Sequence, residues 1–388
     1  MPGRPRHRGA ADRLRGTIIP IKNGAGVPRH TTTGVPDAQV TVHPVTTDDG
    51  LGLQLTRFRR AECDDVVLLV HGLTASSDLF IMPEHRNLAT CLLDNGFADV
   101  WTLDMRMSNR FPYNTEPHTH TLDDIALYDY PAALAELRRH VGERRVHVVA
   151  HCLGSMTFLM SLYAGAVRDV TSVVTSAVGL LMRVPAWSRW KLAYGPALVE
   201  GALGLSQLDP RSGDAAWFSR SGLFSHLVSL AHPECDNPAC HMVSFMWGTG
   251  WPALYSHDKL DPVTHDRIAD LLGPVGLGYH RHIGRVVRAG RAVKYDAAEP
   301  RHAHLPGDYL AAAAKGGPPV LFLTGEHNRV FGDSVVLEHE EMSRETVDPD
   351  RYELFVAPGY GYVDTIIGRD AHRDVFPHLL DFLRRRAV

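Results

Sequence analysis

The chain has 388 residues, of which 44% are hydrophobic and 22% are charged. This is the composition of an ordinary soluble globular protein, and it excludes a disordered, collagen-like or coiled-coil chain. The formal net charge of −4 argues against a globally basic nucleic-acid binder, so we expect no nucleic-acid partner.

Targeting signals and cysteine usage predict a cytoplasmic protein with no membrane partner. The charged N-terminal residues have no apolar segment behind them, unlike a secretory signal. The longest apolar stretch, Val170 to Met182, is shorter than the ~20 residues of a membrane span. Five cysteines, an odd number, do not form a disulfide framework, so reduced thiols are expected.

The chain begins with a segment that lacks any helical or strand period. Residues 1–38 are rich in Arg, Gly, Pro and Thr, and we expect a flexible N-terminal arm. Alternating residues then predict a hairpin, continuous apolar runs predict buried strands, and apolar residues at helical spacing lie between the early strands. The hairpin is expected at 39–43 and 52–58, the strands at 66–70, 98–103, 146–150, 170–175, 320–324 and 352–356, and the helices at 122–140 and 155–164. This order predicts an α/β fold with a mostly parallel, doubly wound sheet.

The alternation of strands and helices stops between residues 182 and 315. This block carries five of the six tryptophans and has a helical pattern. An insertion between two strands of one sheet, on the loop side, is typical of a cap over an active site. We therefore predict a core of residues 39–181 and 316–388, and a helical cap of residues 182–315 that encloses an apolar cavity at the Cys152 end of the sheet.

The strongest chemical signal surrounds Cys152. A strand, a sharp turn and a helix, with small residues around a central nucleophile, make a nucleophile elbow, and Ala150, Gly154 and Ser155 are small enough. A helix N-terminus favours a thiolate, so we expect Cys152 to be partly ionised and to react before the other cysteines. The alternative is a buried structural cysteine at the end of a core strand.

A second signal is the sequence His71-Gly72-Leu73-Thr74, which directly follows the predicted strand 66–70. In hydrolase sheets this loop supplies one backbone N–H of the oxyanion hole, and the residue after the nucleophile supplies the other. Leu73 and Leu153 are therefore the oxyanion candidates. His71 and His151 are candidates for residues of the same pocket.

These motifs resemble the α/β-hydrolase superfamily over residues 40–388. More narrowly, they resemble the hydrolase-like domain that accompanies cholesterol-oxidase-type members of the glucose-methanol-choline oxidoreductase family. The segments that carry this resemblance are 103–108, 122–131, 149–155, 235–241 and 358–364. No Gly-x-Gly-x-x-Gly opens a helix after a strand, so oxidoreductase chemistry is not implied and no cofactor is expected.

The resemblance also implies two further catalytic positions, and both depart from the family pattern. The acid position, after the strand 320–324, holds Asn328, with Glu326 nearby. Asn in this role is compatible with a Cys-His-Asn arrangement. The position of the usual catalytic histidine holds Tyr362, which is a poor base at neutral pH but a capable hydrogen-bond donor.

Cys235, Cys240 and His241 suggest zinc, but they lack the paired Cys-x-x-Cys signature, so no metal site is predicted.

The function expected from the sequence is acyl transfer through a Cys152 thioester on a hydrophobic ester or thioester, free or carrier-bound. The acceptor is water, another molecule, or a carbanion in the same acyl chain. The competing hypothesis is a degenerate, non-hydrolytic protein that binds a ligand or partner. The oligomeric state does not follow from the sequence.

Overall fold

The computed structural model describes residues 34–114, 118–198, 207–276, 278–346 and 348–387. Most of the predicted N-terminal arm lies outside these residues. Its last part packs against the core, since Val35 is buried and the Gly34 carbonyl accepts a 2.6 Å hydrogen bond from the Asn87 amide.

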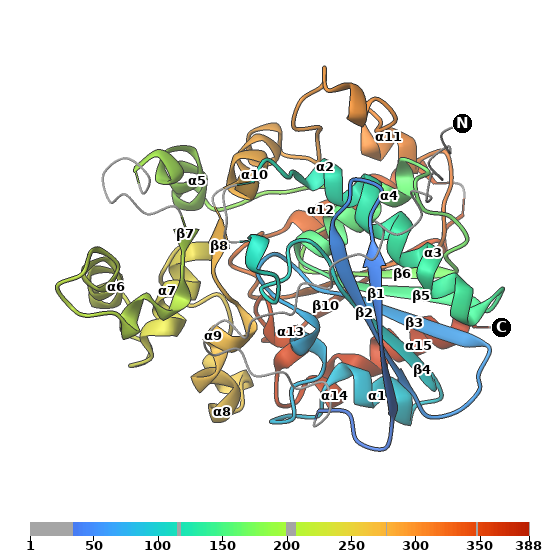
Figure 1. The fold of residues 1–388 in the computed structure, drawn as a ribbon, viewed down its shortest axis with the longest axis horizontal. Coiled ribbons are helices and arrows are strands. Elements are labelled where there is room, and N and C mark those ends of the chain that lie inside the picture. The colour runs from blue at the N-terminus through green and yellow to red at the C-terminus, as the bar shows by residue number, and fades with distance from the viewer. Residues whose placement is uncertain (1–33, 115–117, 199–206, 277, 347, 388) are drawn as a thin grey trace, which may run out of the picture.

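An eight-stranded sheet with the order β1-β2-β4-β3-β5-β6-β9-β10 forms the centre of the molecule (Figure 1). β1 and β2 form the predicted antiparallel hairpin, β2 pairs antiparallel with β4, and the other pairs are parallel. The strands are β1 (Gln39–Thr46), β2 (Gly52–Arg59), β3 (Asp65–Val70), β4 (Asp99–Asp104), β5 (Arg145–His151), β6 (Ser172–Ser176), β9 (Val320–Gly325) and β10 (Tyr352–Ala357). The mostly parallel α/β fold predicted from the apolar runs is confirmed.

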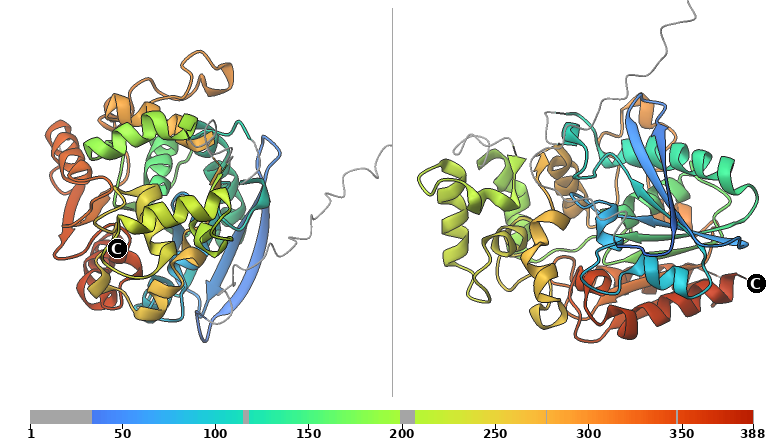
Figure 2. Two further views of the ribbon diagram at one scale, coloured as in Figure 1. Left: turned by 90° about the vertical axis from the view of Figure 1, so that its left-hand side faces the viewer. Right: turned by 60° about the horizontal axis from the view of Figure 1, so that its bottom comes forward.

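Helices cover both faces of this sheet, which explains why the central strands are apolar on both sides (Figure 2). α1 and α15 pack together on one face, and α3 and α4 lie on the other. The helices of the core are α1 (Leu88–Asp94), α2 (Leu122–Asp124), α3 (Tyr130–Val141), α4 (Leu153–Tyr163), α11 (Tyr309–Ala313), α12 (Ser334–Glu345), α13 (Asp364–Ile367), α14 (Ala371–Asp374) and α15 (Phe376–Arg386). A π-helical turn at Ile125–Asp129 separates α2 from α3.

The insertion between β6 and β9 lies at one end of the sheet, on the left in Figure 1. Its elements are α5 (Ala186–Leu198), β7 (Gln207–Leu208), α6 (Arg220–Leu230), α7 (Pro238–Trp247), α8 (Pro262–Asp266), α9 (Ile268–Leu271), β8 (Val275–Gly276) and α10 (Gly278–Ala289). β7 and β8 pair antiparallel.

The cap ends earlier than its predicted boundary at residue 315. Leu181 and Arg291 form an isolated antiparallel bridge, which places the exit and return of the chain side by side. After this bridge the chain packs on α2: the Tyr295 N–H donates to Asp123 at 2.7 Å, and His302 Nε2 lies 3.0 Å from Asp124. Residues 182–290 therefore form the cap, and the segment that follows belongs to the core.

Most cap tryptophans do not pack in the cap interior. Trp187, Trp190, Trp217 and Trp251 are 48%, 50%, 79% and 54% exposed, and Trp187 stacks on Trp190 at the surface. Trp247 is the cap tryptophan that lines the cavity described below. Among the described residues, no helix combines the length and the apolar character that a membrane crossing requires.

Candidate active site

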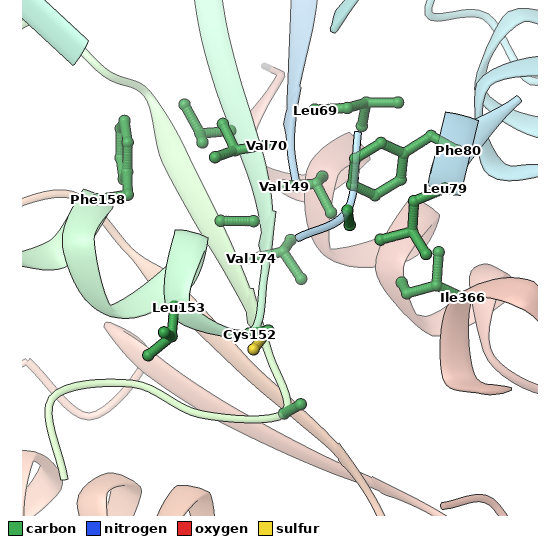
Figure 3. Close-up of a cluster of buried hydrophobic side chains, with 14 of the residues drawn as sticks. Leu69, Val70, Leu79, Phe80, Val149, Cys152, Leu153, Phe158, Val174 and Ile366 are labelled. Carbon is green, nitrogen blue, oxygen red and sulfur yellow. The ribbon is translucent and has the colours of Figure 1, made fainter. Parts of the chain in front are cut away.

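Cys152 occupies the turn between β5 and α4, among buried side chains that include Val149, Leu153 and Val174 (Figure 3). Its backbone has φ 57° and ψ −134°, a conformation that is strained for a residue with a side chain. The turn has no room for larger neighbours. A Cβ added to Gly154 would lie 2.1 Å from the His71 carbonyl oxygen, and one added to Gly72 would lie 2.6 Å from the Cys152 Cβ. The structure thus has the geometry of a nucleophile elbow.

The two predicted oxyanion donors converge on the sulfur of Cys152. The backbone N–H groups of Leu153 and Leu73 both lower the pKa of this thiol, in the way that hydrogen-bond donors to a thiolate do. They come from the start of α4 and from the loop after β3, which the parallel pairing of β3 with β5 places side by side. An acyl group attached to Cys152 would hold its carbonyl oxygen near the same two donors, which is the geometric requirement for an oxyanion hole.

Tyr362 lies next to Cys152, and its hydroxyl lowers the pKa of the thiol as a hydrogen-bond donor. The phenol is buried between His151 and Phe331, with ring centroids 5.1 and 5.8 Å away. Burial, reinforced by the neighbouring sulfur, raises the pKa of Tyr362 well above its usual range. The phenol therefore stays protonated and acts as a donor to the sulfur rather than as a base.

The expectation of a partly ionised Cys152 is wrong. Burial raises the pKa of the thiol to about 11, although the hydrogen bonds from Tyr362, Leu153 and Leu73 act in the opposite direction. Cys152 is 6% exposed. The free energy needed to remove the thiolate from water therefore exceeds the stabilisation that these donors and the helix N-terminus provide.

Asn328 and Glu326 do not join Cys152 and Tyr362. The Asn328 amide donates to the Ala177 carbonyl at 2.8 Å and to Thr324 at 3.1 Å. Its oxygen accepts hydrogen bonds from the Val330 and Phe331 N–H groups. Both ends of the amide therefore bind groups that fix the loop after β9. Glu326 is exposed and accepts a 2.8 Å hydrogen bond from the Gly359 N–H.

His71 and His151 are buried beneath the elbow and do not line the cavity. His71 Nδ1 lies 2.7 Å from the Gly72 carbonyl oxygen, and His151 Nδ1 lies 3.2 Å from the Ser176 hydroxyl. Burial lowers the pKa of His151 to about 3 and also lowers that of His71, so both rings are neutral at pH 7. His151 is still the imidazole that packs on Tyr362.

An apolar cavity lies between the Cys152 end of the sheet and the cap. From the core it is lined by Leu73, Cys152, Leu153, Val330, Phe331 and Tyr362. From the cap it is lined by Met182, Val184, Ser188, Lys191, Leu192, Met246, Trp247, Leu272, His280 and Ile283. The predicted apolar cavity over Cys152 is confirmed.

Three polar residues of the cap, Ser188, Lys191 and His280, line the cavity, and the sequence pattern predicted none of them. The Lys191 ammonium donates to the Phe245 carbonyl and, at 2.5 Å, to the Gly248 carbonyl near the end of α7. Burial lowers its pKa to about 7. His280 lies on α10 and stacks on Trp247, with ring centroids 5.4 Å apart. One signal for Lys191 was available: the sequence holds five lysines among 40 basic residues.

Comparisons with known proteins agree with this architecture. A family described as the alpha/beta hydrolase fold matches residues 65–342. Triacylglycerol lipase 1 of Arabidopsis thaliana is 25% identical over 378 residues, which cover 89% of this chain and 87% of the relative. Lipase 1 of Drosophila melanogaster is 34% identical over 132 residues, which cover 31% of this chain and 28% of the fly protein.

Solved structures show the same fold at low sequence identity. A thermostable carboxyl esterase from Bacillus coagulans has a TM-score of 0.54 and 12% identity, covering 90% of this chain and 99% of that one. A carboxylesterase from Nitrososphaera gargenis has a TM-score of 0.52 and 13% identity, covering 89% and 98%. These findings do not extend to the narrower resemblance to the hydrolase-like domain of the oxidoreductase family, which stays a prediction.

Proposed function

Because the chain belongs to the α/β-hydrolase family of enzymes, we propose that it transfers acyl groups through a thioester on Cys152. The observation that carries the proposal is the position of the sulfur. It lies at an elbow, under the N–H groups of Leu73 and Leu153, at the base of an apolar cavity. The relatives named as lipases and esterases support an ester or thioester substrate.

Acylation in this site follows from the protonated thiol. The sulfur attacks the carbonyl carbon and forms a C–S bond, while the two N–H groups stabilise the oxyanion. The bond to the leaving group then breaks. The thiol proton passes to the departing oxygen or sulfur, and the Tyr362 hydroxyl stays protonated throughout.

Deacylation is where the missing histidine has its largest effect. Water needs a general base, and the buried, protonated phenol of Tyr362 does not provide one at neutral pH. A thiol, an amine or a carbanion attacks a thioester with less assistance than water needs. The acyl-enzyme should therefore react slowly with water and be resolved faster by a better nucleophile, so we expect acyl transfer or cyclisation to exceed hydrolysis.

The cavity favours a hydrophobic acyl group. Its lining is mainly aliphatic and aromatic, and the polar side chains of Lys191 and His280 enter from the cap. A pocket of this kind binds an apolar ligand and orients it through a few polar contacts. The acyl chain should therefore occupy the space under α5, α7 and α10, with its carbonyl carbon at Cys152.

The decisive experiment is mass spectrometry after incubation with acyl thioesters and activated esters of increasing chain length. We expect an adduct with the mass of the acyl group on the peptide that contains Cys152, absent in Cys152→Ala and unchanged in Cys63→Ser. Added thiol or amine should discharge the adduct faster than buffer does. Retention of the intact ester without any adduct would instead support the ligand-binding hypothesis.

A further inference from the structure

Four metal-ligating side chains lie together in the cap. His232 follows α6, Cys235 lies in the next loop, Cys240 is in the first turn of α7, and His257 precedes α8. One ligand atom from each residue lies within 4.8 Å of all the others. Both cysteines are free thiols, so no disulfide competes with this arrangement.

The spacing of the ligand atoms matches a tetrahedral site. Zinc lies about 2.3 Å from sulfur and about 2.0 Å from nitrogen, so adjacent S and N ligands are about 3.5 Å apart. The Cys240 Sγ and His257 Nε2 are 3.5 Å apart. Both of these atoms therefore reach one ion without movement of the backbone.

Both histidines are oriented by partners on the far side of the ring. His232 Nδ1 lies 2.6 Å from the Gly250 carbonyl oxygen, and His257 Nδ1 lies 3.2 Å from the Glu234 carboxylate. The same carboxylate accepts a 3.1 Å hydrogen bond from the Ala253 N–H. Carbonyl and carboxylate partners of this kind fix the ring and its tautomer in metal sites. They leave Nε2 of each ring as the ligand atom, and the buried Nε2 of His232 has no hydrogen-bond partner.

His241, which the sequence placed beside the two cysteines, is not one of the four. Its Nδ1 lies 2.9 Å from the Ser229 hydroxyl, and its Nε2 lies 2.8 Å from the Cys235 carbonyl oxygen. Both ring nitrogens are therefore occupied by protein partners. His241 packs on His232, with ring centroids 4.4 Å apart, and supports the site from outside.

We propose that His232, Cys235, Cys240 and His257 bind one structural Zn²⁺ ion. Two thiolates and two imidazoles form the donor set that selects zinc among the common divalent metals. All four positions are filled by protein, which is the pattern of a structural site, whereas a catalytic zinc keeps an open position. This proposal replaces the expectation of no metal, and it does not depend on the reaction at Cys152.

The ion would tie the cap to the Tyr362 loop. The segment that ends at His257 contains Leu254, whose carbonyl accepts a 3.0 Å hydrogen bond from the Tyr362 N–H. Ser256 in the same segment donates to Asp364 at 3.2 Å. Helix α7, which carries Cys240, also places Met246 and Trp247 in the cavity roof. Zinc should therefore order the roof of the cavity and hold the residue that faces Cys152.

The first test is the metal content of the full-length protein purified without chelator. We expect about one zinc per chain by plasma mass spectrometry. Exchange for cobalt should give the intense visible absorption of a tetrahedral thiolate site. Removal of zinc with a strong chelator should expose two more reactive thiols and lower the melting temperature, and zinc but not magnesium should restore both.

Variants then identify the ligands. Cys235→Ser and His257→Asn should lose the zinc, with their fold checked by circular dichroism. His265→Asn, whose ring lies 5.0 Å from that of His257, should retain it. Glu234→Gln should bind zinc about 10- to 100-fold more weakly, as expected for an outer partner of a ligand. A zinc-free wild type that cannot be loaded, a Cys235–Cys240 disulfide, or full zinc content in Cys235→Ser would each overturn the proposal.

Discussion

The sulfur of Cys152 is subject to opposing effects at the scale of single residues. Three donors and a helix N-terminus favour the thiolate, whereas burial among apolar side chains disfavours it, and burial dominates. Because burial dominates, the thiol should stay protonated and react slowly until a bound substrate brings a carbonyl carbon next to the sulfur. In the proposed reaction, acylation therefore starts from the thiol, with proton transfer coupled to attack.

The pH dependence of alkylation tests this balance. With the thiol pKa at about 11, the labelling rate of Cys152 by a small electrophile should rise about tenfold per pH unit from pH 7 to 10, with no plateau. Tyr362→Phe removes a donor to the thiolate and should slow labelling roughly tenfold, the low end for a hydrogen bond to a charged group. Tyr360→Phe, in the same loop but bonded to Asp374, is the matched control. A plateau below pH 8 would show that the thiol ionises near neutrality.

Restoring the imidazole tests the role of Tyr362 in deacylation. Tyr362→His should speed hydrolysis of the acyl-enzyme by about 10²-fold, the low end of general-base contributions. The gain stays small because the Asn328 oxygen is already bonded to the Val330 and Phe331 N–H groups and cannot orient the new ring. Single-turnover decay of the adduct, followed by mass spectrometry, measures the effect. Rapid hydrolysis by the wild type, unchanged in the variant, would mean that another residue is the base.

Single residues differed in how well the sequence predicted them. Cys152, Leu73 and Leu153 were predictable because a strand, a tight turn and a helix define their positions locally. Asn328 was misassigned because its position in the loop is that of the family acid, while its hydrogen bonds are to its own loop. Lys191 and His280 reach the cavity only through the packing of α5 and α10, which no local pattern encodes.

At the scale of elements, the connection between core and cap depends on one buried carboxyl. Glu338 on α12 is fully buried and accepts a 2.9 Å hydrogen bond from the Leu181 N–H, where the chain leaves the core. The bridge from Leu181 to Arg291 brings the chain back at the same point. This pairing explains why the cap ends near residue 290 although the helical pattern of the sequence continues to 315.

Stability should therefore depend on pH through Glu338. Burial raises its pKa to about 7 from an ordinary value of 4.5, so the unfolded chain releases this proton first as pH rises. The free energy of unfolding should fall between pH 4.5 and pH 7, by up to about 3 kcal/mol. Glu338→Gln should abolish that fall and stabilise the protein at pH 8 but not at pH 4.5. Urea unfolding at both pH values measures it, with Glu340→Gln on the exposed side of α12 as control.

At the scale of the whole molecule, the sheet was predictable and the contacts of the cap were not. Apolar runs of five or six residues specify buried parallel strands, so the α/β core followed from the sequence alone. The exposed cap tryptophans and the four proposed zinc ligands depend on how short helices pack across long sequence separations. The His232 and His257 side chains approach the two cysteines only after α6, α7 and the segment before α8 have assembled.

Core and cap together should set the length of the acyl group, because each supplies part of the cavity wall. Ile283 on α10 is buried and lines the cavity from the cap. Ile283→Trp should fill part of that space and lower kcat/KM for long acyl chains by at least about 10-fold, since one lost methylene contact is worth 1–3 kcal/mol. Transfer of an acetyl group should change less than about threefold, because its short chain does not extend to α10. Leu230→Trp, on α6 and 74% exposed, places the same bulk outside the cavity and should leave both rates unchanged. Equal losses for short and long chains would mean that Ile283 supports the fold of the cap and that the acyl group lies elsewhere.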